Sequence, residues 1–110
     1  MKLSAMRGYG AKLHYYDRYT ENREEITQKL IEESGMTFVP PYDDFAIIAG
    51  QGTCGLELLE EVGHLDHLIT TIGGGGLISG CSIAAKAINP NIQVHGVVPH
   101  CRSNVIESFA

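Results

Sequence analysis

The sequence predicts an α/β protein: a fragment of a three-layer, parallel-sheet fold that contains a βαβ unit. Two apolar, β-branched runs, His67 to Ile72 and Ile92 to Val98, are typical of buried parallel strands. Between them, Gly73 to Gly76 precede a helix predicted from Leu77 to Ile88, and Asn89-Pro90-Asn91 predicts a turn. The helix is apolar on nearly all sides, so we expect it to be buried. Strand, helix and strand in this order predict right-handed parallel pairing.

The first part of the chain predicts a strand, a helix and a short extended segment. Gly10 to Tyr16 is a strand candidate that follows glycine punctuation. Asn22 to Ser34 predicts a helix, with Asn22 as its cap, Glu25 completing a capping-box pattern, and Gly35 as a left-handed stop. Met36 to Val39 is expected to be briefly extended.

Pro40 and Pro41 mark the best candidate for a boundary, because consecutive prolines exclude helix and stiffen the chain. Beyond them come Ile47 to Ala49 and a glycine-containing segment, Gly50 to Thr53. Thr53 is a suitable N-cap for a helix through Leu56 to Val62, in which Glu57 would lie near the positive end of the helix dipole. The segment after the prolines is therefore expected to form one helix before the βαβ unit.

Composition limits the classes of partner. The 110 residues carry a formal charge of −5, and the eight Lys and Arg residues are scattered, so we expect no nucleic-acid partner. The apolar run from Leu68 to Ala85 is interrupted by glycines, and Met1 to Gly10 has no signal-peptide core, so we expect no membrane association. Three cysteines without regular spacing suggest reduced thiols and a cytoplasmic protein.

The run Gly73 to Gly76 is the main candidate for a binding site. Glycines allow the backbone to approach a ligand closely, and successive N–H groups at a helix start can converge on a phosphate. The alternative is a glycine-rich turn that only eases packing. A P-loop requires Gly-Lys followed by Ser or Thr after the glycines, but here Gly76 is followed by Leu77 and Ile78. A dinucleotide site requires an acidic residue for the ribose at the end of the second strand, where this chain has Val98. A compact phosphomonoester remains, and pyridoxal phosphate is the commonest cofactor of that kind.

Several motifs then resemble the middle of serine/threonine dehydratases and serine racemases. The resemblance is carried by Arg7 to Ala11, Pro41 to Asp44, Ala49 to Thr53 with the acid Glu57, Gly73 to Gly80, Asn89-Pro90 and Gly96-Val97. These motifs occur in order along almost the whole chain, but they correspond to only about the middle third of a full-length family member.

The resemblance implies a fold-type II pyridoxal-phosphate enzyme of the tryptophan synthase beta-like superfamily. It places residues 1–39 in a remnant of the small domain and residues 40–110 in the large, cofactor-binding domain. Gly73, Gly74, Gly75, Gly76 and Leu77 would bind the cofactor phosphate, and Gly50 to Thr53 would form a structural turn. The implied reaction converts L-serine or L-threonine to a 2-oxo acid and ammonia.

The same resemblance implies that the catalytic lysine precedes Met1, so we expect no catalytic residue in this chain and no activity of the chain alone. The four lysines, which are Lys2, Lys12, Lys29 and Lys86, lack the expected context. A serine racemase-type isomerase, a non-catalytic phosphate- or cofactor-binding module and an interaction module remain alternatives. Unpaired sheet edges would favour a homo-oligomer or self-association.

No metal site is expected. Many family members carry carboxylates where Val98, Ser103 and Asn104 stand, and their loss removes hard oxygen ligands. Pro40 replaces the usual His before Pro-Tyr-Asp-Asp. The remaining candidates are interpreted as surface histidines (His64, His67), buried inert thiols (Cys54, Cys81), an incomplete ligand set (His100-Cys101) and solvated acidic pairs (Glu32-Glu33, Glu60-Glu61).

Overall fold

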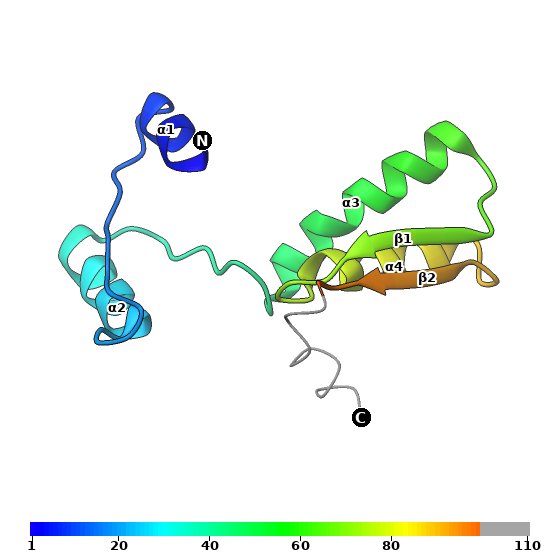
Figure 1. Ribbon diagram of the computed structural model, residues 1–110. Coiled ribbons are helices and arrows are strands. Elements are labelled where there is room, and N and C mark those ends of the chain that lie inside the picture. Colours follow the sequence, from blue (N-terminus) through cyan, green and yellow to red (C-terminus); the bar gives the residue numbers. More distant parts are fainter. Residues whose placement is uncertain (100–110) are drawn as a thin grey trace. The chain divides into compact units, whose positions relative to one another are not determined.

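The computed structural model describes residues 1–99, which divide into two compact units, residues 1–38 and residues 39–99. The first unit contains helices α1 (Lys2–Gly8) and α2 (Arg23–Ser34). The second contains α3 (Phe45–Val62), β1 (His67–Thr71), α4 (Gly76–Ile88) and β2 (Gln93–Val97), as Figure 1 shows. The second unit carries the glycine loop and therefore the candidate site.

Helix α2 forms as its sequence predicts. The Asn22 side chain accepts hydrogen bonds from the amides of Glu24 and Glu25 at 2.9 and 3.4 Å, and its amide group donates to the Glu25 carboxylate at 3.2 Å. Gly35 ends the helix in the left-handed conformation, with φ of 67°. The Asn22 cap and the glycine stop are thus both confirmed, whereas Glu25 accepts from the side-chain amide of Asn22 and not from its backbone N–H, so the capping box is incomplete.

The strand predicted from Gly10 to Tyr16 is wrong, because this segment forms no strand, and helix α1, which the sequence did not predict, precedes it. Met36 to Val39, which was expected to be extended, forms neither helix nor strand. A strand satisfies its backbone groups only against a neighbouring strand, and the described part of this unit offers none. Tyr15 instead accepts a hydrogen bond from the Arg7 guanidinium at 2.6 Å.

The βαβ unit is confirmed, and with it the α/β class. Strands β1 and β2 pair in parallel, from His67 opposite Gln93 to Thr71 opposite Val97. The turn before β2 is closed by Asn89, whose side chain accepts from the Asn91 amide and whose carbonyl accepts from the Ile92 amide, both at 3.1 Å. Each of these elements begins and ends within two residues of its predicted bounds.

Helix α3 begins nine residues earlier than predicted, with its N-cap at Asp44 and not at Thr53. The Asp44 carboxylate accepts from the amides of Ala46 and Ile47 at 2.8 and 3.1 Å. The segment Gly50 to Thr53 is therefore helical, not a turn, and Thr53 is not a cap. Glu57 lies well inside the helix, away from its positive end.

Glycines in α3 allow this helix to pack closely against α4. A Cβ on Gly52 would lie 3.0 Å from the Gly80 carbonyl oxygen, and one on Gly80 would lie 2.2 Å from the Ile48 carbonyl oxygen. A Cβ on Gly55 would lie 3.1 Å from the Cα of Cys81. The two helices consequently approach backbone to backbone, which explains why α3 tolerates residues that ordinarily weaken a helix.

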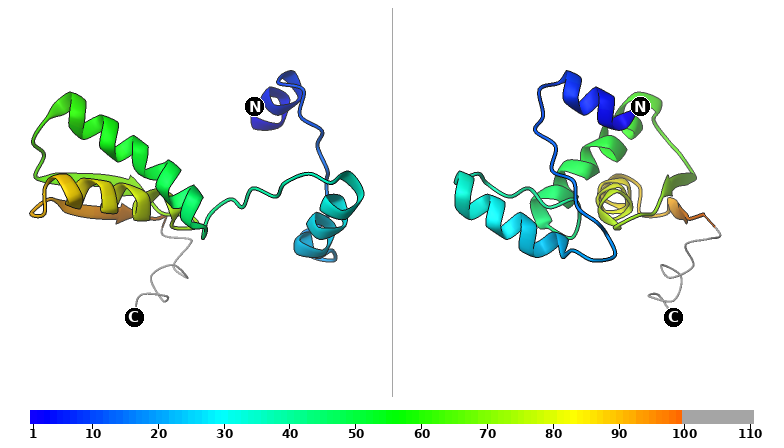
Figure 2. Two further views of the ribbon diagram at one scale, coloured as in Figure 1. Left: turned by 180° about the vertical axis from the view of Figure 1, so that it is seen from behind. Right: turned by 60° about the vertical axis from the view of Figure 1, so that its left-hand side comes forward.

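A small core lies between the helices and the strand pair. Its buried members come from α3, β1, α4 and the residue before β2, and they are Leu59, Leu68, Cys81, Ala85 and Ile92. Figures 1 and 2 show α3 and α4 on the same side of the strand pair. The expectation that α4 is buried all round is wrong, because Ile83 on its outer surface is 66% exposed. None of the helices in residues 1–99 has the length and apolar character needed to span a bilayer.

Candidate functional site

The glycine loop follows the carboxyl end of β1 and leads into the first turn of α4 (Figure 1). Gly73 to Gly75 bend the chain, and Gly75 caps the helix with φ of 90°. Because L-residues with a side chain rarely adopt that conformation, glycine is required at position 75. The loop therefore lies where the partial positive charge of the helix dipole is concentrated.

Six consecutive backbone amides, from Gly73 to Ile78, donate to no protein acceptor within residues 1–99. On either side the pairing resumes: the Ile72 amide donates to the Val97 carbonyl, and the Ser79 amide to the Gly75 carbonyl, both at 3.0 Å. Gly76 is buried. The first amides of a helix have no intrahelical partner, and here the preceding loop adds the amides of Gly73 to Gly75, so this run is suited to an external acceptor.

These amides adjoin a pocket of about 190 Å³. Its lining comes from the loop, the end of β1, the segment before α3 and α3 itself: Pro41, Tyr42, Gln51, Thr71, Gly73, Gly74, Gly75, Gly76 and Leu77. The lining holds no carboxylate, lysine or arginine. An anion would therefore meet no like charge and would be held by amide dipoles and the start of α4. The site suits one compact phosphate.

Tyr42 and Gln51 are site residues that the sequence reading missed. A Cβ on Gly74 would lie 2.1 Å from the Tyr42 ring, so the ring rests directly against the loop. Gln51 reaches the pocket because α3 already runs through that position. The missed signal was Asp44, a strong N-cap residue whose recognition would have brought both residues towards the loop.

None of the four lysines lines this pocket. Lys2, Lys12 and Lys29 belong to the first unit, and all three are exposed. Lys86 lies in the last turn of α4, and its ammonium donates to the Ile92 carbonyl at 2.7 Å. Lys86 thus ties the end of the helix to the start of β2, at the opposite end of α4 from the loop.

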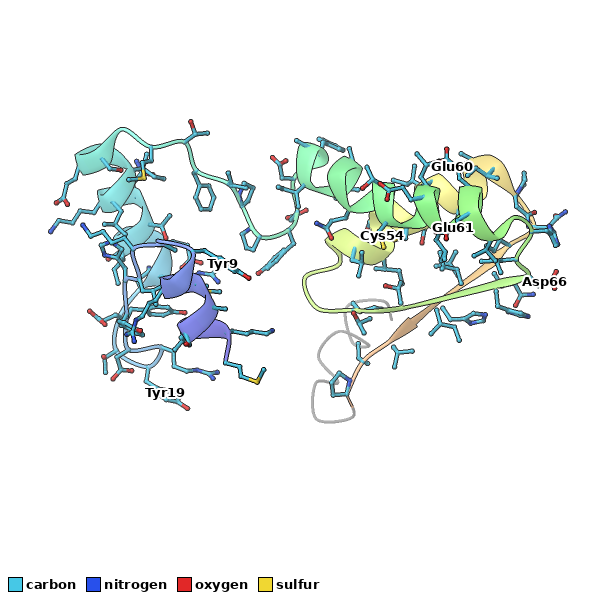
Figure 3. The ribbon with its side chains drawn as sticks, turned by 90° about the horizontal axis from the view of Figure 1, so that it is seen from above. Tyr9, Tyr19, Cys54, Glu60, Glu61 and Asp66 are labelled. Atoms are coloured by element: carbon cyan, nitrogen blue, oxygen red, sulfur yellow. The ribbon has the colours of Figure 1, made fainter. Side chains whose placement is uncertain are left out.

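Other candidates fall outside the site. Cys81 is buried, and burial raises the pKa of its thiol, with the neighbouring Cys54 thiol raising it further. Cys54 is exposed, which corrects the expectation that both thiols are buried. Figure 3 labels Cys54 on α3.

The other candidate residues also lie outside the pocket. Glu60 and Glu61 are exposed and lie further along α3 than Cys54 (Figure 3). The His64 side chain contacts the Asp66 carboxylate at 3.2 Å. His100, Cys101, Ser103 and Asn104 lie outside the described residues.

The family model described as "Pyridoxal-phosphate dependent enzyme" matches residues 1–110. The chain belongs to this family. The family resemblance drawn from the glycine motifs is thereby confirmed, as is the assignment of the fold to the fold-type II enzymes, in which the cofactor is pyridoxal phosphate.

Individual relatives span three activities. The chain is 48% identical over 109 residues to an L-threo-3-hydroxyaspartate ammonia-lyase of Saccharomyces cerevisiae, covering 99% of this chain and 33% of that protein. It is 41% identical to a catabolic L-threonine dehydratase of Staphylococcus aureus, with coverage of 98% and 31%. The structure of maize serine racemase superposes with a TM-score of 0.90 at 39% identity, covering 97% of this chain and 34% of that one. The chain therefore spans about a third of the length of the relatives it matches.

Proposed function

We propose that the loop from Gly73 to Leu77 holds the phosphate of pyridoxal phosphate. The observation that carries the proposal is the run of amides without protein acceptors, aimed from a helix start beside an uncharged pocket. Family membership supports the identity of the ligand, because it supplies a cofactor with one terminal phosphate. In this role the chain binds and orients the cofactor, with Tyr42 and Gly74 fixing the shape of the loop.

The activity of a full-length enzyme that contains this chain is proposed to be an ammonia-lyase reaction on a hydroxy amino acid, giving a 2-oxo acid and ammonia. When bound, pyridoxal phosphate supplies an electron sink for negative charge at the substrate α-carbon. L-Serine and L-threonine are the proposed substrates, and the yeast relative's name adds L-threo-3-hydroxyaspartate as a third. A racemase is the alternative, supported by the similarity to maize serine racemase.

The 110-residue chain is proposed to bind without turnover. The reaction needs a lysine beside the cofactor, and none of the lysines of this chain lines the pocket. Residues 1–39 are proposed to come from the small domain and residues 40–110 from the large one. A cytoplasmic location belongs to the same proposal, supported by the free thiols of Cys54 and Cys81.

Binding is tested by titrating the ¹⁵N-labelled chain with pyridoxal phosphate and with pyridoxal, which lacks the phosphate. We expect the amide signals of Gly73 to Leu77 to shift with the first ligand only. Gly75→Ala should weaken binding about tenfold, because a side chain at this φ costs about 1–2 kcal/mol. Gly63→Ala is the matched control: Gly63 also has positive φ (83°) and lies at the far end of α3.

Two results would contradict the proposal. Equal shifts with pyridoxal would show that the phosphate is not recognised, and equal losses in the Gly75 and Gly63 variants would show that the loop has no special role. Release of 2-oxo acid from L-serine, L-threonine or L-threo-3-hydroxyaspartate by the chain alone would refute the claim of binding without turnover, while leaving the phosphate site intact.

A further inference from the structure

Two side chains that can bind a metal ion lie on the face of the strand pair that α4 does not cover. Alternate residues of β1 and β2 point to this face, and all of them are exposed: His67, Ile69, Thr71, Gln93, His95 and Val97. Two of the six are histidines, and they belong to different strands. The glycine loop uses neither of them.

His67 and His95 are diagonal neighbours in the parallel register, since His67 lies opposite Gln93 and His95 lies opposite Ile69. Nδ1 of His67 and Nε2 of His95 are 3.0 Å apart. The ring centroids are 5.2 Å apart, with the ring planes inclined by 31°. Two hydrogen-bonded strands thus hold two imidazole nitrogens close together at a solvent-accessible point.

That nitrogen separation is compatible with two ligands of a single metal ion. Imidazole nitrogens bind zinc at about 2.0–2.1 Å. Two such bonds at a right angle place the nitrogens about 2.9 Å apart, and at a tetrahedral angle about 3.3 Å apart. The observed 3.0 Å falls between these values, and a shared ion would replace the hydrogen bond that now joins the two rings.

We propose that His67 and His95 form a two-imidazole site for one divalent transition-metal ion. Imidazole is a preferred ligand of zinc, copper and nickel, and water would complete the coordination on this exposed face. Within residues 1–99 no third His, Cys, Asp or Glu side chain lies close enough to share an ion with these two rings, so the site depends on the two rings alone. This site differs in position and in ligand type from the carboxylate site that many family members have at the positions of Val98, Ser103 and Asn104. It also does not depend on the proposed binding of cofactor.

Isothermal titration calorimetry with Ni²⁺, at a concentration at which sedimentation shows the chain to be monomeric and this face therefore uncovered, tests the site, because Ni²⁺ favours imidazole and does not oxidise thiols. All proteins carry Cys101→Ser, which removes one competing thiolate. We expect one ion per chain, and His67→Asn and His95→Asn should each weaken binding by at least about tenfold, since either removes half of the protein ligands. His64→Asn is the matched control and should bind as the parent does.

A second measurement uses the parent chain without changing either histidine. On addition of Zn²⁺ up to one equivalent, long-range ¹H–¹⁵N spectra should show the imidazole signals of His67 and His95 shifting together. Unchanged signals from these two rings would overturn the proposal, as would parental affinity in either variant. An equal loss of affinity in His64→Asn would also overturn it. Circular dichroism of each variant separates lost binding from lost folding.

Discussion

Cys54 and Cys81 are expected to differ in reactivity because the two side chains have different surroundings. Cys54 is exposed on α3, whereas Cys81 is buried at the contact between α3 and α4, where its Sγ donates to the Gln51 carbonyl at 3.7 Å. Burial raises the pKa of the Cys81 thiol, and the nearby Cys54 thiol adds to that effect. At a given pH, fewer Cys81 side chains are therefore thiolates, the form that reacts.

Iodoacetamide at pH 8 should modify Cys54 at least about tenfold faster than Cys81, in a Cys101→Ser background. Tenfold protection requires only about 1.4 kcal/mol of local opening free energy. Peptide mass mapping over time gives both rates, and urea should abolish the difference. Because the folded chain keeps the Cys81 proton at higher pH than the unfolded chain does, stability should also fall as the pH rises through the thiol range. Equal rates in the absence of urea would contradict the buried position of Cys81.

At the scale of elements, the contact between α3 and α4 depends on glycines that have no room for a side chain. A Cβ on Gly80 would lie 2.2 Å from the Ile48 carbonyl oxygen and 2.5 Å from the Gly52 amide nitrogen, both of them backbone atoms. Neither atom can move without displacing the helix to which it belongs. The pairing of the helices, and with it the direction in which α4 presents the glycine loop, rests on this approach.

Gly80→Ala should therefore lower the free energy of unfolding by about 1–3 kcal/mol, the usual cost of overpacking. Gly50→Ala is the matched control: Gly50 is likewise an interior helix glycine, in α3, and no atom lies within 4 Å of its would-be Cβ. That change should stabilise the chain by about 0.5–1 kcal/mol, because alanine favours helix. Urea denaturation followed by circular dichroism gives both values. Equal effects of the two changes would show that the helices do not approach as closely as described.

The sequence predicted the elements whose signals are local. Helix α2 has a cap and a glycine stop, and the βαβ unit has apolar runs separated by glycines and by Asn89-Pro90-Asn91. Helix α3 was mispredicted because Gly50 and Gly52 were interpreted as turn residues, although the contact with α4 is a tertiary cause of glycine. The candidate site divides in the same way: the position of the glycine loop follows from local sequence, whereas the positions of Tyr42 and Gln51 depend on the course of α3.

At the scale of the whole molecule, the chain exposes more apolar surface than a stable monomer ordinarily does. Parallel sheets are usually covered on both faces, but the outer face of the strand pair leaves Ile69 68% exposed. On the helical side, a groove of about 290 Å³ is lined mainly by apolar residues of α3 and α4, and Phe45 beside it is 92% exposed. Each strand also has one edge without a partner in the described residues.

The isolated chain should therefore self-associate, and sedimentation velocity should show its average mass rising with concentration above the 12.0 kDa of one chain. Ile69→Lys and Ile83→Lys should each lower the average mass, because an ammonium on either face opposes burial against a second copy. Leu3→Lys, a matched change at an exposed apolar residue of α1, should leave it unchanged. A parent chain that stays monomeric at all concentrations and melts cooperatively would show that these surfaces need no cover. Association unaffected by both isoleucine changes would instead place the contact at the strand edges.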